Sequence, residues 1–312
     1  MGMKSRRSIG YGLGVLLAAA GASCWSLGGA LVRLTANIDA WQIIFYRSLT
    51  LLACMLPWLI AKHGVRLPQR IAEAGANAII AGIASGTAGI TLIAALFYTT
   101  VAQAIFMVGL APFLSAILGY WILRERIAGI TWLAMTVALM GMAIMLAGNA
   151  GSGSLIGTML AVYSAFCFSC YSVLLRWGQD TDMSVALIWN ALFLIVLSGV
   201  ALLVPNGFRQ ASGLAELGIG ITNILVCVVM GAVQLGFGLI LFTRASRSVP
   251  AAQLALIALI EPTLSPLWAW LVAGELPPLL TFAGGFVILF AIAVQALLSA
   301  RRRRPAYLYE MS

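Results

Sequence analysis

Long apolar runs separated by short polar connections divide the whole sequence. Each run is close to the roughly 20 residues that an α-helix needs to cross the hydrocarbon core of a bilayer. The pattern predicts ten membrane-spanning helices, at residues 11–33, 39–61, 75–97, 101–123, 128–147, 155–176, 183–204, 218–242, 250–273 and 279–299. A water-soluble fold is excluded, because helices that are apolar on every side have no face to present to water.

The composition fits a membrane as the solvent of this chain. Hydrophobic residues make up 62% of the 312 positions and charged residues only 9%, which is too few to cover a soluble domain. The net charge is +9, but the cations lie at the ends of the runs and in the tails, so no nucleic-acid partner is expected. The expected partners are a small-molecule substrate and membrane lipid, with the chain acting as a monomer or a homodimer.

The positive charges alternate between the two sides of the predicted helices. With the N-terminus in the cytoplasm, fifteen of the 18 Lys and Arg residues fall on the inside, and only Arg33 and Arg209 fall at the outer face. This imbalance follows the positive-inside rule for membrane proteins. We therefore expect both termini in the cytoplasm and a basic cytoplasmic tail at residues 301–312.

Two blocks of sequence recur in the second half of the chain. At an offset of 143 residues, eight positions within 14–33 match identical residues within 157–176. At an offset of 150 residues, seven positions within 95–125 match identical residues within 245–275. Each copy holds five predicted spans, an odd number, so the second copy enters the membrane from the opposite side.

The repeat and the span count together predict the fold class. We expect an all-α polytopic membrane protein whose ten transmembrane helices form two inverted five-helix repeats around a central cavity. The first repeat covers residues 1–147, a flexible linker covers 148–154, and the second repeat covers 155–300. Inverted repeats favour transport, because each half can adopt the conformation of the other around a site at the midplane.

Two ionisable side chains, Arg47 and Glu261, lie deep within predicted spans. A charge at the bilayer centre costs about 3 kcal/mol on insertion scales, so such residues are candidates for function. One hypothesis is that Arg47 faces a carboxylate of a polar or zwitterionic solute, while Glu261 faces an ammonium group or exchanges a proton. The structural alternative is that Arg47 only neutralises Glu261 or binds carbonyls at a helix end.

Prolines and aromatic residues mark the spans that would enclose the cavity. Pro112, Pro262 and Pro266 remove helix hydrogen bonds at mid-membrane and are candidate hinges, although a packing kink is the alternative. Aromatic rings on these spans are candidates to line a substrate pocket, although many aromatic residues of membrane proteins only face lipid or the interface. The aromatic candidates are Trp25, Tyr98, Tyr163, Phe168 and Trp189.

Sequence motifs for catalysis or ATP-driven transport are missing. The chain has no GxSxG elbow, Walker loop or HExxH pair, and its single histidine, His63, excludes a histidine-based metal site. Cys167 and Cys170 form a CxxC inside an apolar run, where they behave as small hydrophobes. We expect no enzyme activity, cofactor or metal. A channel, which needs a pore ring or filter, is the weaker alternative.

Several short motifs resemble the EamA type of the drug/metabolite transporter superfamily. They are Trp25-Ser26, Phe45-Tyr46-Arg47, Ala111-Pro112-Phe113-Leu114 with Glu125-Arg126, and Glu261-Pro262-Thr263-Leu264 with Gly274-Glu275. The resemblance covers nearly the whole chain. It implies a basket-like bundle in which spans one to four and six to nine surround the cavity, while spans five and ten brace it from outside.

The resemblance also implies an activity. Proteins of this type usually export amino acids, other small metabolites or drugs across a bacterial inner membrane, and the many aromatic residues here favour aromatic or hydrophobic amino acids. A drug, a vitamin or a nucleotide derivative is the alternative substrate. The two halves differ at the charged positions, since Ala111 stands at the equivalent of Glu261 and Asn190 at the equivalent of Arg47. A symmetric mechanism with two acids is therefore not expected.

Overall fold

The computed structural model describes residues 10–35, 38–147, 154–203, 220–274 and 276–309. These residues form helices joined by short turns and contain no strand. Several of the predicted features lie outside them. These are residues 148–153 of the linker, Arg209, Glu275, residues 310–312 of the tail, and the basic residues Lys4, Arg6 and Arg7.

The first repeat contains α1 (Tyr11–Ser26), α2 (Gly28–Arg33), α3 (Ala40–His63), η1 (Gly64–Arg66), α4 (Leu67–Leu96), α5 (Val101–Val108), α6 (Ala111–Leu123) and α7 (Gly129–Ala147). The second repeat contains α8 (Leu155–Trp177), η2 (Met183–Val185), α9 (Ala186–Leu203), α10 (Ile221–Val229), η3 (Met230–Phe237), α11 (Gly238–Ala245), α12 (Ala251–Ala258), α13 (Ile260–Ala273) and α14 (Leu279–Tyr309). The prediction of an all-helical membrane protein is thereby confirmed.

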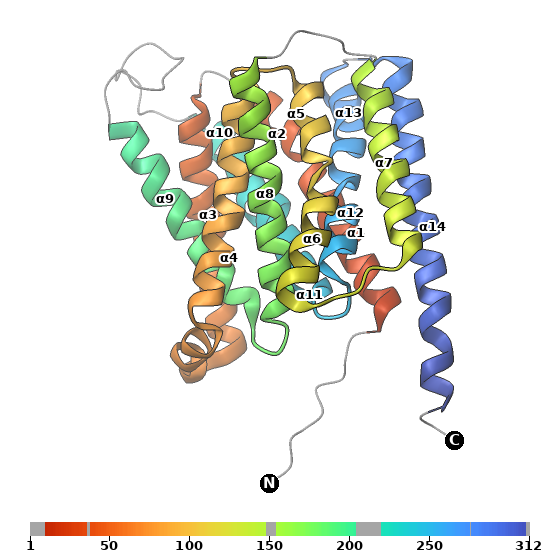
Figure 1. Ribbon diagram of the computed structural model, residues 1–312. Coiled ribbons are helices and arrows are strands. Elements are labelled where there is room, and N and C mark those ends of the chain that lie inside the picture. Colours follow the sequence, from red (N-terminus) through yellow and green to blue (C-terminus); the bar gives the residue numbers. More distant parts are fainter. Residues whose placement is uncertain (1–9, 36–37, 148–153, 204–219, 275, 310–312) are drawn as a thin grey trace.

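The described residues hold nine apolar helical stretches long enough to cross a membrane. One of them, Ala40–Leu96, reverses its direction at Gly64–Arg66, so α3 and α4 are two crossings that run in opposite directions (Figure 1). Gly64 permits the reversal because it has a φ of 55°, which side chains rarely allow. The nine stretches therefore contain the ten predicted spans.

The two repeats enter the bundle from opposite ends. We call the end at which α1 begins the basal face; the connections at 64–66, 178–182 and 246–250 also lie there (Figure 1). The other end is the distal face, where α8 begins. This arrangement is the inverted topology that an odd number of spans in each copy requires.

Glycines let neighbouring helices approach closely, as is usual in membranes. A Cβ atom added at Gly82 of α4 would lie 2.6 Å from the carbonyl of Ala186 and 2.7 Å from the nitrogen of Asn190, both in α9. The pair α7 and α14 packs in the same way at Gly141 and Gly284, and it flanks one edge of the bundle (Figure 1).

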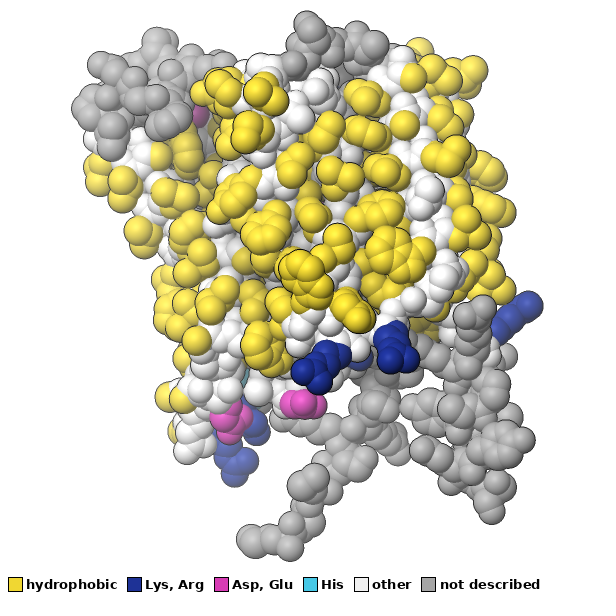
Figure 2. Space-filling view, in the orientation of Figure 1, with side chains coloured by type: hydrophobic (Ala, Val, Ile, Leu, Met, Phe, Trp, Pro, Cys, Tyr) yellow, Lys and Arg dark blue, Asp and Glu magenta, His cyan; other side chains and the backbone are white. Residues whose placement is uncertain are grey.

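The outer wall of the bundle is apolar. Figure 2 shows hydrophobic side chains over most of the visible wall, whereas the charged side chains of the described residues gather at the basal end. This distribution suits a body whose wall contacts lipid and whose ends contact water. The chain is accordingly a multi-pass membrane protein.

Replacing Gly82 by alanine should separate α4 from α9. The added methyl group has no free space, so we expect the Gly82→Ala variant to lose about 1–3 kcal/mol of stability, measured as a lower thermal unfolding midpoint in detergent. Gly89 in the same helix is the control, because nothing lies within 4 Å of a Cβ atom there. An unfolding midpoint lowered equally by Gly89→Ala would contradict this packing argument.

Candidate functional site

Four spans depart from regular α-helix within the bundle, among them the fourth, which breaks at Gly109–Leu110 between α5 and α6. The first span breaks at Leu27 between α1 and α2, and the ninth breaks at Leu259 between α12 and α13. The eighth span contains η3, a π-helical segment of eight residues. Such breaks free backbone groups and recur at binding sites in transporters, and π-helical turns are frequent at functional sites.

Side chains from two spans bind the polar groups at the break in the first span. The Ser265 hydroxyl donates to the carbonyl of Ser26 at 3.1 Å, and the Trp268 indole donates to the Ser26 hydroxyl at 2.8 Å. From η3, the Gln234 amide donates to the carbonyl of Trp25 at 3.3 Å. These contacts bring three of the irregular segments together. We call Trp25, Ser26, Gln234, Ser265 and Trp268 the break cluster.

Arg47 lies in α3, beside η3. The backbones of the two segments are so close that a Cβ atom at Gly231 would collide with the carbonyl of Arg47. The Nε atom of Arg47 is buried and has no hydrogen-bond partner, and no carboxylate of the described residues pairs with its guanidinium within 4.0 Å. An uncompensated buried charge of this kind is destabilising unless a ligand or ion satisfies it.

Glu261 lies in the first turn of α13, where the helix dipole favours a negative charge. Its backbone carbonyl accepts a hydrogen bond from Ser265 at 2.9 Å, which places it next to the break cluster. The carboxylate interacts with Arg47 through space, without a direct ion pair. The structure therefore brings the two predicted charges into one site while leaving each of them available to a ligand.

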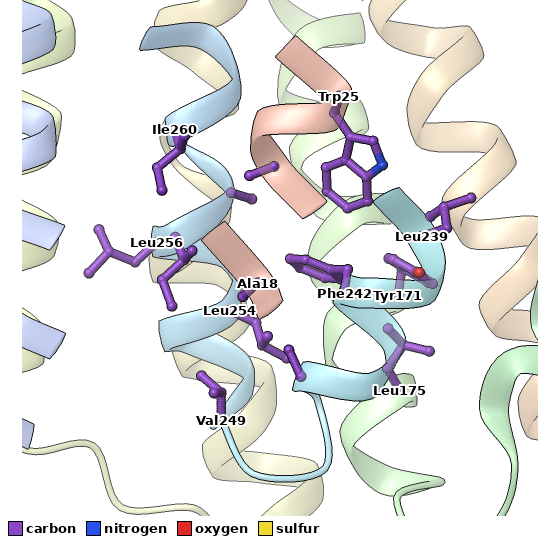
Figure 3. Close-up of a cluster of buried hydrophobic side chains, with 14 of the residues drawn as sticks. Ala18, Trp25, Tyr171, Leu175, Leu239, Phe242, Val249, Leu254, Leu256 and Ile260 are labelled. Carbon is purple, nitrogen blue, oxygen red and sulfur yellow. The ribbon is translucent and has the colours of Figure 1, made fainter. Parts of the chain in front are cut away.

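An aromatic cluster joins this site to the basal side of the bundle. Trp25 and Phe168, which occupy equivalent positions in the two repeats, meet edge to face at 6.2 Å between ring centroids. Phe242 lies 4.8 Å from Trp25 and stacks on Tyr171 at 6.2 Å. Figure 3 shows Trp25, Phe242, Tyr171 and Leu175 in succession. We call Trp25, Phe168, Tyr171 and Phe242 the aromatic layer.

The structure does not bring the other predicted aromatic residues to Arg47 and Glu261. Tyr98 follows α4 near the distal face and is 49% exposed, and Tyr163 on α8 is 50% exposed. Trp189 on α9 packs against Gly82 of α4. Trp25 and Trp268 belong to the break cluster, and Phe168 packs against Trp25.

The prolines lie at the helix breaks. Pro112 is in the first turn of α6, just after the break in the fourth span at Gly109–Leu110, and Pro262 is in the first turn of α13. A proline in this position loses little, because the first N–H groups of a helix have no partner within it. Pro266 lies inside α13, one residue after Ser265.

The equivalent contact in the other repeat is closed. Ser169, the equivalent of Ser26, donates to the carbonyl of Ala111 at 2.9 Å, and both residues are buried. Ala111 is the equivalent of Glu261, so the first repeat has no acid at this position. The site is consequently asymmetric, with its acid on α13 alone.

Sequence reasoning did not assign roles to Ser26, Gln234 and Ser265. A signal existed for two of them, because Ser26 matches Ser169 and Ser265 matches Ser115 across the repeat. No signal marked Gln234, because its placement depends on the π-helical turn. Its oxygen Oε1 is buried without a partner among the described residues, so the break cluster keeps a free acceptor.

A model of the EamA-like transporter family matches residues 12–147 and 155–297. Two named relatives are similar over most of their length. The pseudopaline exporter CntI of Pseudomonas aeruginosa is 27% identical over 285 residues, or 89% of this chain and 94% of the relative. Protein RarD of Escherichia coli is 25% identical over 300 residues, or 93% of this chain and 96% of the relative.

One further relative matches only part of the chain, and one solved structure is similar in fold. An uncharacterized transporter of Clostridium kluyveri is 30% identical over 164 residues, and the match spans half of each chain. One solved crystal structure superposes with a TM-score of 0.71 at 18% identity and covers 93% of this chain and 98% of that one. At this identity the similarity shows the shared fold.

The hydrogen bond between Trp268 and Ser26 should couple the two residues energetically. We expect Ser26→Ala and Trp268→Phe to destabilise by non-additive amounts, with a coupling of about 0.5–1.5 kcal/mol, in a double-mutant cycle of thermal unfolding. Trp132→Phe is the control partner, because Trp132 is exposed on α7. Strict additivity of Ser26→Ala and Trp268→Phe would show that the bond is absent.

Proposed function

Because the chain belongs to the EamA-like transporter family, we propose that it exports amino acids or similar small metabolites, with aromatic and hydrophobic amino acids favoured. Export proceeds across a bacterial inner membrane by alternating access, with the basal face and both termini in the cytoplasm. The observation that carries this proposal is the guanidinium of Arg47, whose buried Nε atom has no hydrogen-bond partner and which pairs with no carboxylate of the described residues.

Arg47 supplies the group that recognises a carboxylate. A guanidinium offers several N–H donors in a planar fork that matches the two oxygens of a carboxylate. Its charge lacks a direct partner in the described structure, so an incoming carboxylate would replace water without first breaking an ion pair. The negative charge of Glu261, which interacts with Arg47 without a direct ion pair, suits the ammonium group of the same molecule. Opposite charges in this order fit the head of a zwitterionic amino acid.

The surroundings suit an apolar side chain on the solute. Trp25 and Trp268 belong to the break cluster, and Phe168 packs against Trp25; pockets for small ligands are commonly apolar with a few polar groups that fix orientation. The direction of transport is supported by the relative named as an exporter. The cytoplasmic position of the basal face is supported by Lys62, Arg124 and Arg247, among other cations of that end.

Removing the guanidinium should abolish recognition of the carboxylate. In proteoliposomes, counterflow of labelled phenylalanine by Arg47→Gln should fall by at least about tenfold, the factor that corresponds to one lost hydrogen bond to a charged group. Arg66→Gln, which removes an exposed arginine of η1, should retain the wild-type rate. Full counterflow by the folded Arg47→Gln protein would remove Arg47 from the site. Conductance in place of saturable counterflow would instead indicate a channel.

Replacing Glu261 should weaken the binding of an amino acid but not the binding of an analogue that lacks the ammonium group. We expect Glu261→Gln to weaken competition by phenylalanine by about tenfold while leaving competition by 3-phenylpropionate unchanged, because only phenylalanine has a charge for Glu261 to bind. Glu73→Gln, at an exposed acid of α4, is the matched control. An equal loss for both competitors would show that Glu261 does not bind the ammonium group.

A further inference from the structure

One buried carboxylate ties together three connections at the basal face. Asp182 lies in the turn between α8 and η2, and its side chain is only 3% exposed. Its Oδ2 atom accepts a hydrogen bond from Lys62 Nζ at 2.6 Å and lies 2.7 Å from His63 Nε2. Arg247, in the turn between α11 and α12, reaches its Oδ1 atom at 3.7 Å. Contacts with the Asp182 side chain therefore hold the ends of α3, α8 and α11 together.

A second arginine extends this network. Arg176, at the end of α8, donates from Nε to Glu125 at 2.8 Å, and from Nη1 to the carbonyls of Ser246 at 3.1 Å and Arg247 at 2.8 Å. Glu125 belongs to the connection between α6 and α7. Charge-assisted hydrogen bonds of this length are among the stronger contacts in proteins. The network therefore joins both repeats across the basal end.

The part of the ninth span that lies on the basal side of the site is buried. Every residue from Ala251 to Ile260 is buried, whereas every residue from Glu261 to Trp268 is partly exposed. Trp25, Tyr171 and Phe242 of the aromatic layer are buried as well (Figure 3). The ninth span is thus tightly enclosed on the basal side of the site and more accessible on the distal side.

The equivalent residue at the distal face is not fastened. Asp39 corresponds to Asp182 at the offset of 143 residues, and both cap a helix in the same way. Asp39 Oδ1 accepts from the backbone N–H of Trp41 at 3.3 Å, and Asp182 Oδ1 from that of Ser184 at 3.2 Å. The second oxygen of Asp39, however, is buried and has no hydrogen-bond partner among the described residues. The capping aspartate therefore binds cationic side chains at the basal face, whereas its equivalent at the distal face binds none among the described residues.

From this contrast we propose that Asp182 latches the basal face shut, and that Lys62 and His63 release Asp182 in each transport cycle when that face opens to the solute. Closing one face while the other is accessible is what alternating access requires of inverted repeats. The proposal rests on membership of a transporter family and does not depend on which solute is carried. Its test therefore needs no substrate.

The latch should not open through protonation of Asp182 near neutral pH. Burial by itself would raise the pKa of Asp182, but Lys62, Ser184 and His63 together hold that pKa well below its usual range. The stability contributed by such a carboxylate is present above its ordinary pKa of about 3.9 and is lost only as the pH falls through the lowered value. We expect basal closure to persist between about pH 5.5 and 7.5.

Thiol labelling can detect the opening of the basal face. Ala18 is fully buried within the cluster of Figure 3 and takes a cysteine with little change in size. In a protein whose five native cysteines are replaced, we expect Asp182→Asn to raise the maleimide labelling rate of Ala18→Cys by about tenfold. Asparagine keeps one oxygen to cap Ser184, but it loses the charge and has an NH2 group in place of the oxygen that Lys62 and His63 contact. Asp180→Asn, two residues away and exposed, should leave the rate unchanged.

A second cysteine position distinguishes a shift of the conformational equilibrium from a general loosening of the fold. Leu264, on the face of α13 that carries Glu261 and Trp268, is partly exposed, so labelling of Leu264→Cys should slow down in Asp182→Asn as the distal side closes. General loosening would instead raise labelling at both positions and would overturn the proposal. An unchanged rate at Ala18→Cys would do the same. If Asp182→Asn does not fold, the double variant Lys62→Gln/His63→Gln takes its place. The labelling rates of Ala18→Cys and Leu264→Cys then support or overturn the proposal in the same way.

Discussion

A bilayer offers no hydrogen bonds to an exposed peptide group, and this constraint determines both the fold and the place of its site. Regular helices satisfy their own backbone, so ten of them can pack through glycines such as Gly82 and Gly141 with few polar contacts. Where a helix breaks, its carbonyls need other donors. Ser265 and Gln234 supply them at Ser26 and Trp25, and those donors draw three spans together at mid-bundle.

The repeats share this framework but carry different chemistry. Ser169 closes against Ala111 in one half, while the equivalent residues of the other half leave Glu261 beside Arg47 without a direct ion pair. Symmetry of the backbone provides two states of similar energy, and asymmetry of the side chains provides a single polar site between them. The charged network around Asp182 adds a reason for the basal face to be closed in this state.

Hydrophobic patterning predicted the spans and the depth of Arg47 and Glu261, because burial in lipid depends on composition over about 20 residues. The repeat predicted the inverted topology from matches such as Arg33 with Arg176. The rotation of each span was not predictable in the same way. A helix that is apolar on all sides gives no signal of which face turns inward, so Tyr98 and Tyr163 could not be separated from Trp25. The π-helical turn around Gln234 depends on its packing against α3, which local sequence does not encode.

We propose that a solute binds where the broken helices meet the unpaired Arg47. An experimental density map of the protein with its transported solute bound can decide this. Solute density is expected within hydrogen-bond distance of the Arg47 guanidinium, between α3 and the first turn of α13. Solute density at another depth, with Arg47 instead paired to Glu261, would contradict it.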